Sequence, residues 1–457
     1  MECKLPSPRT YDVKSSSASA HEKKTLQLSS CDFLAVLLCI FIVLFPKAGV
    51  KIGSVPLTWG YCLLGISAVI ACPVAVSGGA ILRISRLTLI AITALLPFQA
   101  TLLYSILVNG IRDWGYALSD ITNFILLPTV ILVLFKPWCS KLNWSVVLRA
   151  LRTFVFLAAA YGIILFCIGL LTGHTVEIPY LTVNADDYGS VGTEKDNSRN
   201  GILKLISTYN NGNLYGVATI ILMPLFDLLE PRRWRRAILR IALVMTLSRT
   251  VWIALLLDQI FAFCAGLWSN LWNFPIIRPA RLLKPVMYML PLIGLLFVGL
   301  KVMARDFDFL FDPTFGDRLD QFQAFASFTI FPSLPVADIA EVVYASVLNS
   351  LGLVGFLSVL LLLGSPLLIT LLDKRLLNNP IRAAALKGLL LYAVIAWADG
   401  AITLIPVMTF YWFTMFLLIN GDGISWQSAS EVTQSFQPIA RPSPLWVSNP
   451  RSQQLGR

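Results

Sequence analysis

The stretch VMTLSRTVWIALLLDQ, residues 244–259, holds the feature that decides how this chain folds. It is apolar on both sides of Ser248 and Arg249, and each side has the composition of a helix inside a membrane. A charged side chain is costly in hydrocarbon, so a guanidinium here needs a partner, a wet cavity or a function. Similar apolar runs, separated by short polar breaks, fill most of the chain.

The composition is that of a membrane protein, with 56% hydrophobic and 13% charged residues over 457 positions. The apolar runs are continuous and close to the ~20 residues that a spanning helix needs, whereas a membrane barrel shows alternation. We therefore predict an all-α polytopic membrane protein with about twelve transmembrane helices. The predicted spans are 32–49, 56–77, 87–108, 118–135, 153–172, 211–229, 237–247, 250–269, 285–303, 341–371, 386–398 and 401–420.

The polar segments complete this organisation around a transmembrane domain at 32–420. The tails 1–31 and 421–457 are rich in Ser, Pro and Gln and are predicted to be flexible. Two long loops, 173–210 and 304–340, mix aromatic and charged residues and are predicted to be ordered caps. Within the second loop, Arg318, Phe322 and Phe325 have the spacing of a short interfacial helix.

The distribution of charge predicts the orientation. Connections that alternate sides place 26 of the 36 Lys and Arg residues on one side, together with both tails. Because basic residues concentrate on the cytoplasmic side, we predict that both termini are cytoplasmic and both long loops exterior. The basic residues are dispersed over many loops, which does not favour nucleic-acid binding.

Two short predicted helices set the location of a candidate site. Segment 237–247 has eleven residues, or ~16 Å of helix, too short to cross the hydrocarbon unaided. Segment 386–398 is also short and ends at Asp399 and Gly400. Turns that dip inward from the same side predict a cavity open to the exterior, lined by Arg249 with Asp399 nearby. A cation there suits a phosphate; the alternative is that Arg249 snorkels to the interface or pairs with an exterior acid.

Two carboxylates have competing interpretations. Asp258 lies near the middle of a predicted span, where it is either functional or a neutral or paired structural residue. Asp338 and Glu341 are three residues apart before an apolar run, which predicts a capping box. The alternative makes Glu341 a partly buried general base at the rim of the cavity. Neither metal nor cofactor is predicted, because the two histidines are far apart and the eight cysteines are scattered.

The motifs together resemble the O-antigen ligase and O-antigen polymerase superfamily of bacterial inner-membrane proteins. Nine residues separate Glu341-Val342 from Gly352-Leu-Val-Gly355, in the register of a family motif whose ligase branch has His at the first position. An acid there is common in the polymerase branch. LSRTVWIALL (247–256), FGDRLDQFQAF (315–325) and YNNGNLYGVATIILM (209–223) are similar to further family segments, although Asp317 interrupts the expected Gly-Arg-Leu.

This resemblance implies polymerisation of undecaprenyl-diphosphate-linked oligosaccharide repeat units into O-antigen or exopolysaccharide, by metal-independent inverting glycosyl transfer at the periplasmic face. The implied catalytic residues are Glu341 as base, with Arg249 and Arg318 as cations. The implied substrate-binding residues are Arg199, Lys204, Asn211, Asn213 and Asp399. A flippase and a chain-length regulator are the implied protein partners. The alternatives are a ligase of the same superfamily and a transporter of lipid-linked oligosaccharides.

Overall fold

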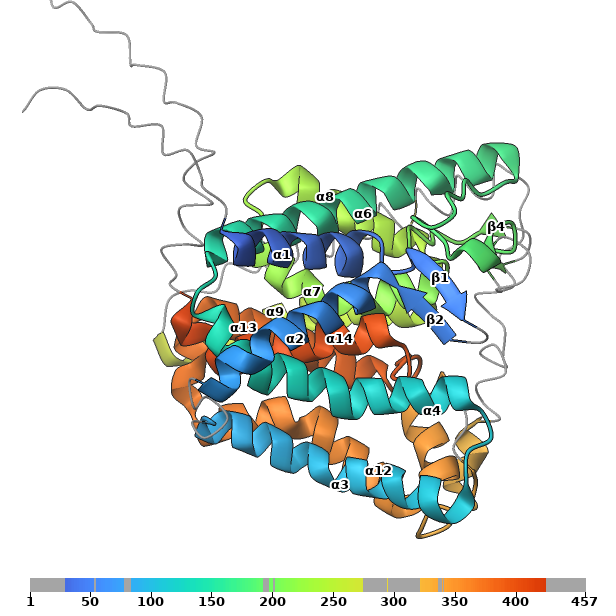
Figure 1. The fold of residues 1–457 in the computed structure, drawn as a ribbon. Helices are drawn as coiled ribbons and strands as arrows, with labels where there is room; N and C mark the ends of the chain where they lie inside the picture. The colour runs from blue at the N-terminus through green and yellow to red at the C-terminus, as the bar shows by residue number, and fades with distance from the viewer. Residues whose placement is uncertain are drawn as a thin grey trace, which may run out of the picture.

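The fold is described from a computed structural model of the chain (Figure 1). The structure describes residues 29–52, 55–77, 84–191, 197–199, 202–273, 294, 321–335, 339 and 341–424. The predicted tails fall almost wholly outside these ranges, as does the predicted span 285–303.

The first half of the chain forms five long helical stretches and one hairpin. Asp32 closes a capping box with Ser29 and also accepts a hydrogen bond from Asn143 N at 2.8 Å, which fixes the start of the first helix against the sixth. The elements are α1 (Ser30–Cys39) with the π turn Ile40–Leu44, β1 (Gly49–Ile52), β2 (Val55–Thr58), α2 (Trp59–Ser77), α3 (Arg86–Asn109), α4 (Trp114–Ile121), the π turns Thr122–Leu126 and Thr129–Leu134, α5 (Phe135–Cys139) and α6 (Trp144–Thr172).

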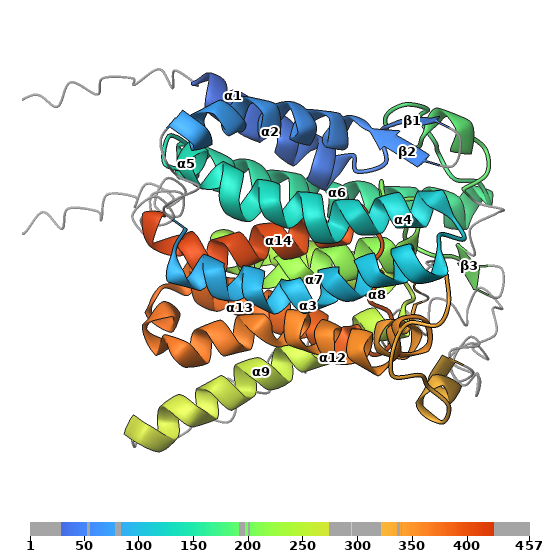
Figure 2. The same cartoon turned by 60° about the horizontal axis from the view of Figure 1, so that its bottom comes forward.

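The second half alternates helices with irregular segments. Its elements are the 3-10 turn Ala185–Asp187, β3 (Ser198–Arg199), β4 (Ile202–Leu203), α7 (Gly212–Leu229), α8 (Arg233–Met245), α9 (Arg249–Asn273), the 3-10 turn Phe322–Phe325, α12 (Val343–Leu372), the 3-10 turn Lys374–Asn378, α13 (Pro380–Ile395), α14 (Ile405–Asn420) and the 3-10 turn Gly421–Gly423. Figure 2 shows α9 leaning away from the other helices. Both views place the strands at one end of the bundle, which we call the loop end.

Six of the described helices are long and apolar enough to cross a membrane, so the all-α membrane class is confirmed at this level. They are Trp59–Ser77, Arg86–Asn109, Trp114–Cys139, Trp144–Thr172, Gly212–Leu229 and Val343–Leu372. Ser30–Leu44 and Ile405–Asn420 are shorter apolar helices. The twelve spans and their orientation stay predictions. The predicted helix 32–49 is too long, because the chain leaves it after Leu44 and turns into the β1–β2 hairpin.

The core is centred on α7, whose apolar window is 89% buried. Two glycines, which have no side chain, let neighbouring helices approach α7 closely. A Cβ on Gly388 of α13 would lie 2.1 Å from the Ile221 carbonyl oxygen of α7. A Cβ on Gly216 of α7 would lie 2.3 Å from a methyl group of Val251 in α9. Small residues at helix crossings are how membrane helices gain packing contact, and here they fix α7 against α9 and α13.

Helix α12 bends where a loop docks on it. Gly352 has φ 69°, and Leu353 N and Val354 N donate to Thr329 O at 2.8 Å and to Ile330 O at 3.1 Å. The loop therefore replaces the acceptors that a straight helix would have supplied. Asn109 Nδ2 donates to Pro332 O at 3.0 Å, which ties the same loop to α3.

Replacing Gly388 by alanine should lower the free energy of unfolding by at least 1–3 kcal/mol, roughly the cost of overpacking a core. The added methyl group meets backbone of α7, which cannot move aside cheaply. The measurement is the thermal unfolding midpoint of the purified protein in detergent. Gly364→Ala in α12 is the matched control, because a Cβ there has nothing within 4 Å; equal midpoints for the two variants would contradict the packing described here.

Candidate functional site

Arg249 begins α9 directly after a buried turn. Thr246, Leu247 and Ser248 are at most 1% exposed, so the turn is buried within the protein. Its predicted depth below the exterior membrane surface stays a prediction. Leu247 has φ 53°, a region that bulky side chains rarely occupy. Backbone strain of this kind persists only where the surroundings hold it, and it gathers at functional sites. The surrounding structure therefore holds this turn in a conformation that is unfavourable for Leu247.

Segment 204–211 lies against this turn. Leu205 N donates to Met245 O at 3.1 Å. A Cβ on Gly212 would lie 2.9 Å from Leu205 O and 3.4 Å from Thr246 O, so the segment, the turn and the start of α7 approach at one point. Lys204 is only 7% exposed there. The structure thus brings Lys204 to the turn that carries Arg249.

The same segment is anchored to the rest of the loop end. Ser207 and Asn210 have φ of 51° and 59°. Ser207 Oγ donates to Ala158 O at 2.7 Å, and the Tyr209 hydroxyl donates to Val43 O at 3.0 Å. Burial raises the pKa of Tyr209 well above its ordinary value, so the phenol is a neutral donor. These bonds hold the strained backbone in place.

Asn211 and Asn213 have different roles. Asn211 Oδ1 accepts hydrogen bonds from Asn213 N at 2.8 Å and Leu214 N at 3.1 Å, so Asn211 is the N-cap of α7. Asn213 Oδ1 is buried and has no hydrogen-bond partner among the described residues. A buried polar atom without a partner is uncommon and needs an explanation, of which ligand binding is one.

Glu341 and the Asp399 turn lie together. Gly400 N donates to Glu341 O at 3.0 Å, and Val343 N donates to Ala396 O at 3.2 Å. Asp399 is 3% exposed, whereas Glu341 is exposed. Ala401 follows with φ 45°, another strained position at this end of the protein.

The capping-box prediction for Glu341 is wrong, and so is its expected partial burial. Helix α12 begins at Val343, two residues after Glu341, and its N-cap makes no side-chain capping bond. The first backbone N–H groups find other acceptors, since Val342 N donates to Gln321 Oε1 at 3.0 Å and Val343 N to Ala396 O. The Glu341 carboxylate is therefore not needed as a cap.

Helix register places Lys204 and Arg249 at the same level of the bundle as Glu341 and Asp399. Asp258 Oδ1 of α9 lies 2.6 Å from Lys387 Nζ of α13. The loop end holds the start of α9 and the end of α13, so the two helices run in opposite directions. Arg249 precedes Asp258 by nine residues and Ala396 follows Lys387 by nine, which is ~13 Å along each axis in the same direction. Arg249, Lys204, Glu341 and Asp399 therefore share the loop end. The 2.6 Å contact also favours the paired structural interpretation of Asp258.

Two predicted site residues are not placed as side chains. The structure describes only the backbone of Arg199, which pairs with Ile202 in the β3–β4 hairpin. Arg318 lies outside the described residues, while Phe322 and Phe325 form one 3-10 turn. The roles of both arginines stay predictions.

An aromatic cluster beside Glu341 was missed from the sequence. Trp397 is 42% exposed and stacks on Phe325 with ring centroids 6.0 Å apart. Tyr344 lies 4.5 Å from the same indole. The sequence feature that could have predicted this cluster is Trp397, two residues before Asp399. Aromatic residues are common at the ends of membrane helices, so Trp397 alone does not indicate a site.

Two cavities in the described part of the chain lie away from these residues. A polar cavity of about 300 Å³ is lined by His174, Glu177, Tyr188 and neighbours in the 173–203 loop. An apolar one lies among the helices. The hollow predicted at Arg249 stays a prediction. Within the described part of the chain, no group of three or more His, Cys, Asp or Glu could hold a metal ion.

Comparison with known proteins gives no family assignment. Neither a protein-family model nor a curated protein sequence matches this chain.

Asn211→Ala should lower the free energy of unfolding by about 1 kcal/mol, because it removes the N-cap of α7. Asn213→Ala should leave stability unchanged within about 0.5 kcal/mol, because the side-chain oxygen has no partner to lose. Denaturation of both variants in detergent measures this difference. A larger loss of stability for Asn213→Ala than for Asn211→Ala would reverse the roles given to the two side chains.

Proposed function

We propose that this protein is a membrane glycosyltransferase that extends a glycan carried on a polyprenyl diphosphate. The finer proposal is a bacterial inner-membrane polymerase of O-antigen or exopolysaccharide repeat units, with its site on the periplasmic face. The observation that carries the proposal is the common level of Arg249, Lys204, Glu341 and Asp399 at the loop end. Two cations and two carboxylates at one end of the bundle suit a reaction that releases a diphosphate and transfers a proton to a base.

The proposed reaction is a single displacement. A hydroxyl oxygen of the acceptor sugar attacks the anomeric carbon of the donor, while the bond from that carbon to the diphosphate oxygen breaks. The hydroxyl proton passes to the Glu341 carboxylate, and the electron pair of the broken bond leaves with the polyprenyl diphosphate. Attack opposite the leaving group inverts the anomeric centre.

The cations have the properties that leaving-group stabilisation requires. Charge develops on the diphosphate as the bond breaks, and fixed cations in a partly desolvated site stabilise it more than water does. Lys204 is almost fully buried and held by its backbone bond from N to Asn197 O at 2.7 Å. Arg249 sits on the strained turn, and the resemblance adds Arg318 and Arg199 to the same role.

Glu341 is suited to meet an acceptor that arrives from outside. Its side chain is exposed, so a bulky glycan can reach it, while two backbone bonds fix the segment that carries it. Asn213 Oδ1 is buried without a hydrogen-bond partner among the described residues, and in this proposal it accepts a hydrogen bond from a sugar hydroxyl. Asp399 is buried beside Glu341 and would orient the hydroxyl or a neighbouring cation.

A transporter is the second candidate, because charged side chains lie inside the helical bundle. Lys387 pairs with Asp258, and Arg240 pairs with Asp227. Intramembrane charges mark ion or substrate paths in many transporters. These four are paired with each other, which is the arrangement expected of structural pairs.

The test is conversion of undecaprenyl-diphosphate-linked repeat units into longer glycan ladders by the purified full-length protein. Glu341→Gln should slow elongation by about 10²–10⁴-fold, the usual contribution of a general base. Arg249→Ala should slow it by about 10²–10³-fold, the usual contribution of one group that stabilises developing charge.

Two matched variants control this experiment. Asp186→Asn and Arg112→Ala change exposed charges outside the candidate site and should keep the parental rate. Equal ladders from all variants would reject the site. No ladder from the parent, together with movement of the lipid-linked oligosaccharide across vesicle membranes, would establish the transporter instead.

A further inference from the structure

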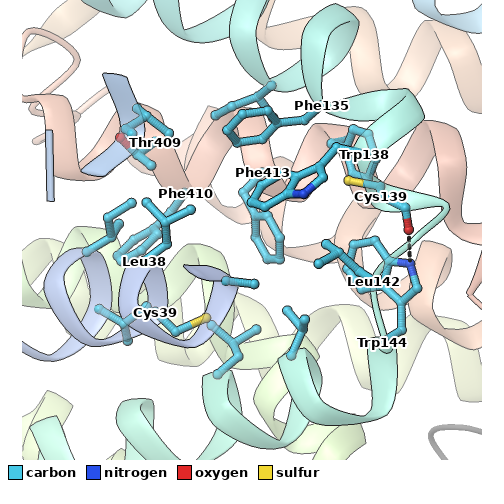
Figure 3. A pocket seen from close by; sticks show the side chains of 18 residues that line it. Leu38, Cys39, Phe135, Trp138, Cys139, Leu142, Trp144, Thr409, Phe410 and Phe413 are labelled. Carbon is cyan, nitrogen blue, oxygen red and sulfur yellow. Dashed lines mark hydrogen bonds between the residues drawn. The ribbon is translucent and has the colours of Figure 1, made fainter. Parts of the chain in front are cut away.

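A cavity of about 110 Å³ lies between α1, α2, α5, α6 and α14, far from the residues of the proposed reaction (Figure 3). Its walls are apolar side chains such as Leu38, Leu64, Phe410 and Phe413. The one hydroxyl among them, on Thr409, is used within α14, where it donates to Ile405 O at 2.8 Å. The cavity therefore offers hydrocarbon surface and little else.

Two tryptophans, Trp138 and Trp144, line this apolar cavity, and each carries an indole N–H that can donate a hydrogen bond. Trp144 Nε1 donates to Cys139 O at 3.2 Å, the bond drawn in Figure 3. Trp138 is 4% exposed and also lines the cavity, but its Nε1 has no hydrogen-bond acceptor among the described residues. A buried N–H without an acceptor is costly, so a ligand that supplies one is favoured.

The surroundings limit what the ligand can be. Three of the five helices that form the walls are long and apolar enough to span a membrane, where lipid chains would surround them. An apolar cavity of roughly 150 Å³ stays dry and takes a small hydrocarbon such as benzene. A comparable volume here accepts a segment of a lipid chain, provided that an acceptor oxygen reaches Trp138.

We propose that this cavity binds the ester end of one acyl chain of a glycerophospholipid, with the ester carbonyl oxygen accepting the hydrogen bond of Trp138 Nε1. Lys136 and Lys141 flank Trp138 in the sequence and would attract the phosphate of the headgroup. An isoprenoid chain does not fit as well, because it carries no oxygen along its length. The inference is independent of the proposed glycosyl transfer.

The experiment uses the full-length protein in detergent and phosphatidylglycerol that carries a photoreactive diazirine in one acyl chain. After photolysis, mass spectrometry of the peptides should find the label on the cavity-lining parts of α1, α5 and α14. Trp138→Phe should weaken saturable labelling about two- to tenfold, the value of one neutral hydrogen bond. Trp144→Phe is the matched control and should keep the parental affinity, because its N–H is already bonded within the protein.

A second variant fills the cavity while keeping both indoles. Ala35 lines the cavity, so Ala35→Phe should abolish saturable labelling without changing Trp138. The proposal is overturned if label spreads evenly over the outer helices, if Trp144→Phe loses as much as Trp138→Phe, or if Ala35→Phe labels like the parent. It is also overturned if undecaprenyl phosphate displaces the probe and unlabelled phosphatidylglycerol does not.

Discussion

The loop end depends on one constraint, that buried backbone N–H and C=O groups must find partners where a helix is interrupted. Two pairs of irregular segments satisfy this for each other. Segment 204–211 bonds to the turn after α8, and the segment before α12 bonds to the turn after α13. Neither segment of a pair could be buried without the other, because its polar backbone groups would lack partners. The constraint therefore brings two distant parts of the chain together in each pair, with the charged residues they carry.

Close helix contacts determine where the gathered segments sit. Gly388 lets α13 approach the backbone of α7, Gly216 of α7 leaves room for the Val251 side chain of α9, and the Asp258–Lys387 pair fixes the relative height of α9 and α13. A shift of α13 by one turn would move Asp399 about 5.4 Å along the bundle relative to Arg249. Leu247 and Ala401 keep positive φ angles at this end, and strained backbone of this kind persists only where the surrounding structure holds it.

The sequence was sufficient for features that depend on composition and on helix length. Apolar runs predicted the helices, and the short segment before Ser248 predicted a buried turn. It was not sufficient for features that depend on distant partners. The β1–β2 hairpin forms because strands pair with each other and Gly49 bridges to Asn184. Glu341 looked like a cap because the acceptors for Val342 N and Val343 N come from residues 321 and 396, which no local pattern reveals.

Helix α1 connects the two regions that matter most. The π turn Ile40–Leu44 that continues it accepts hydrogen bonds from Thr208 and Tyr209, which hold segment 204–211 at the loop end. Its middle lines the apolar cavity through Leu38 and Cys39. A chain in that cavity would add packing to one face of α1, and a better-packed α1 holds its carbonyl groups more firmly in place. The order of the strained, cation-bearing segment therefore depends on apolar packing along the length of the bundle as well as on local hydrogen bonds.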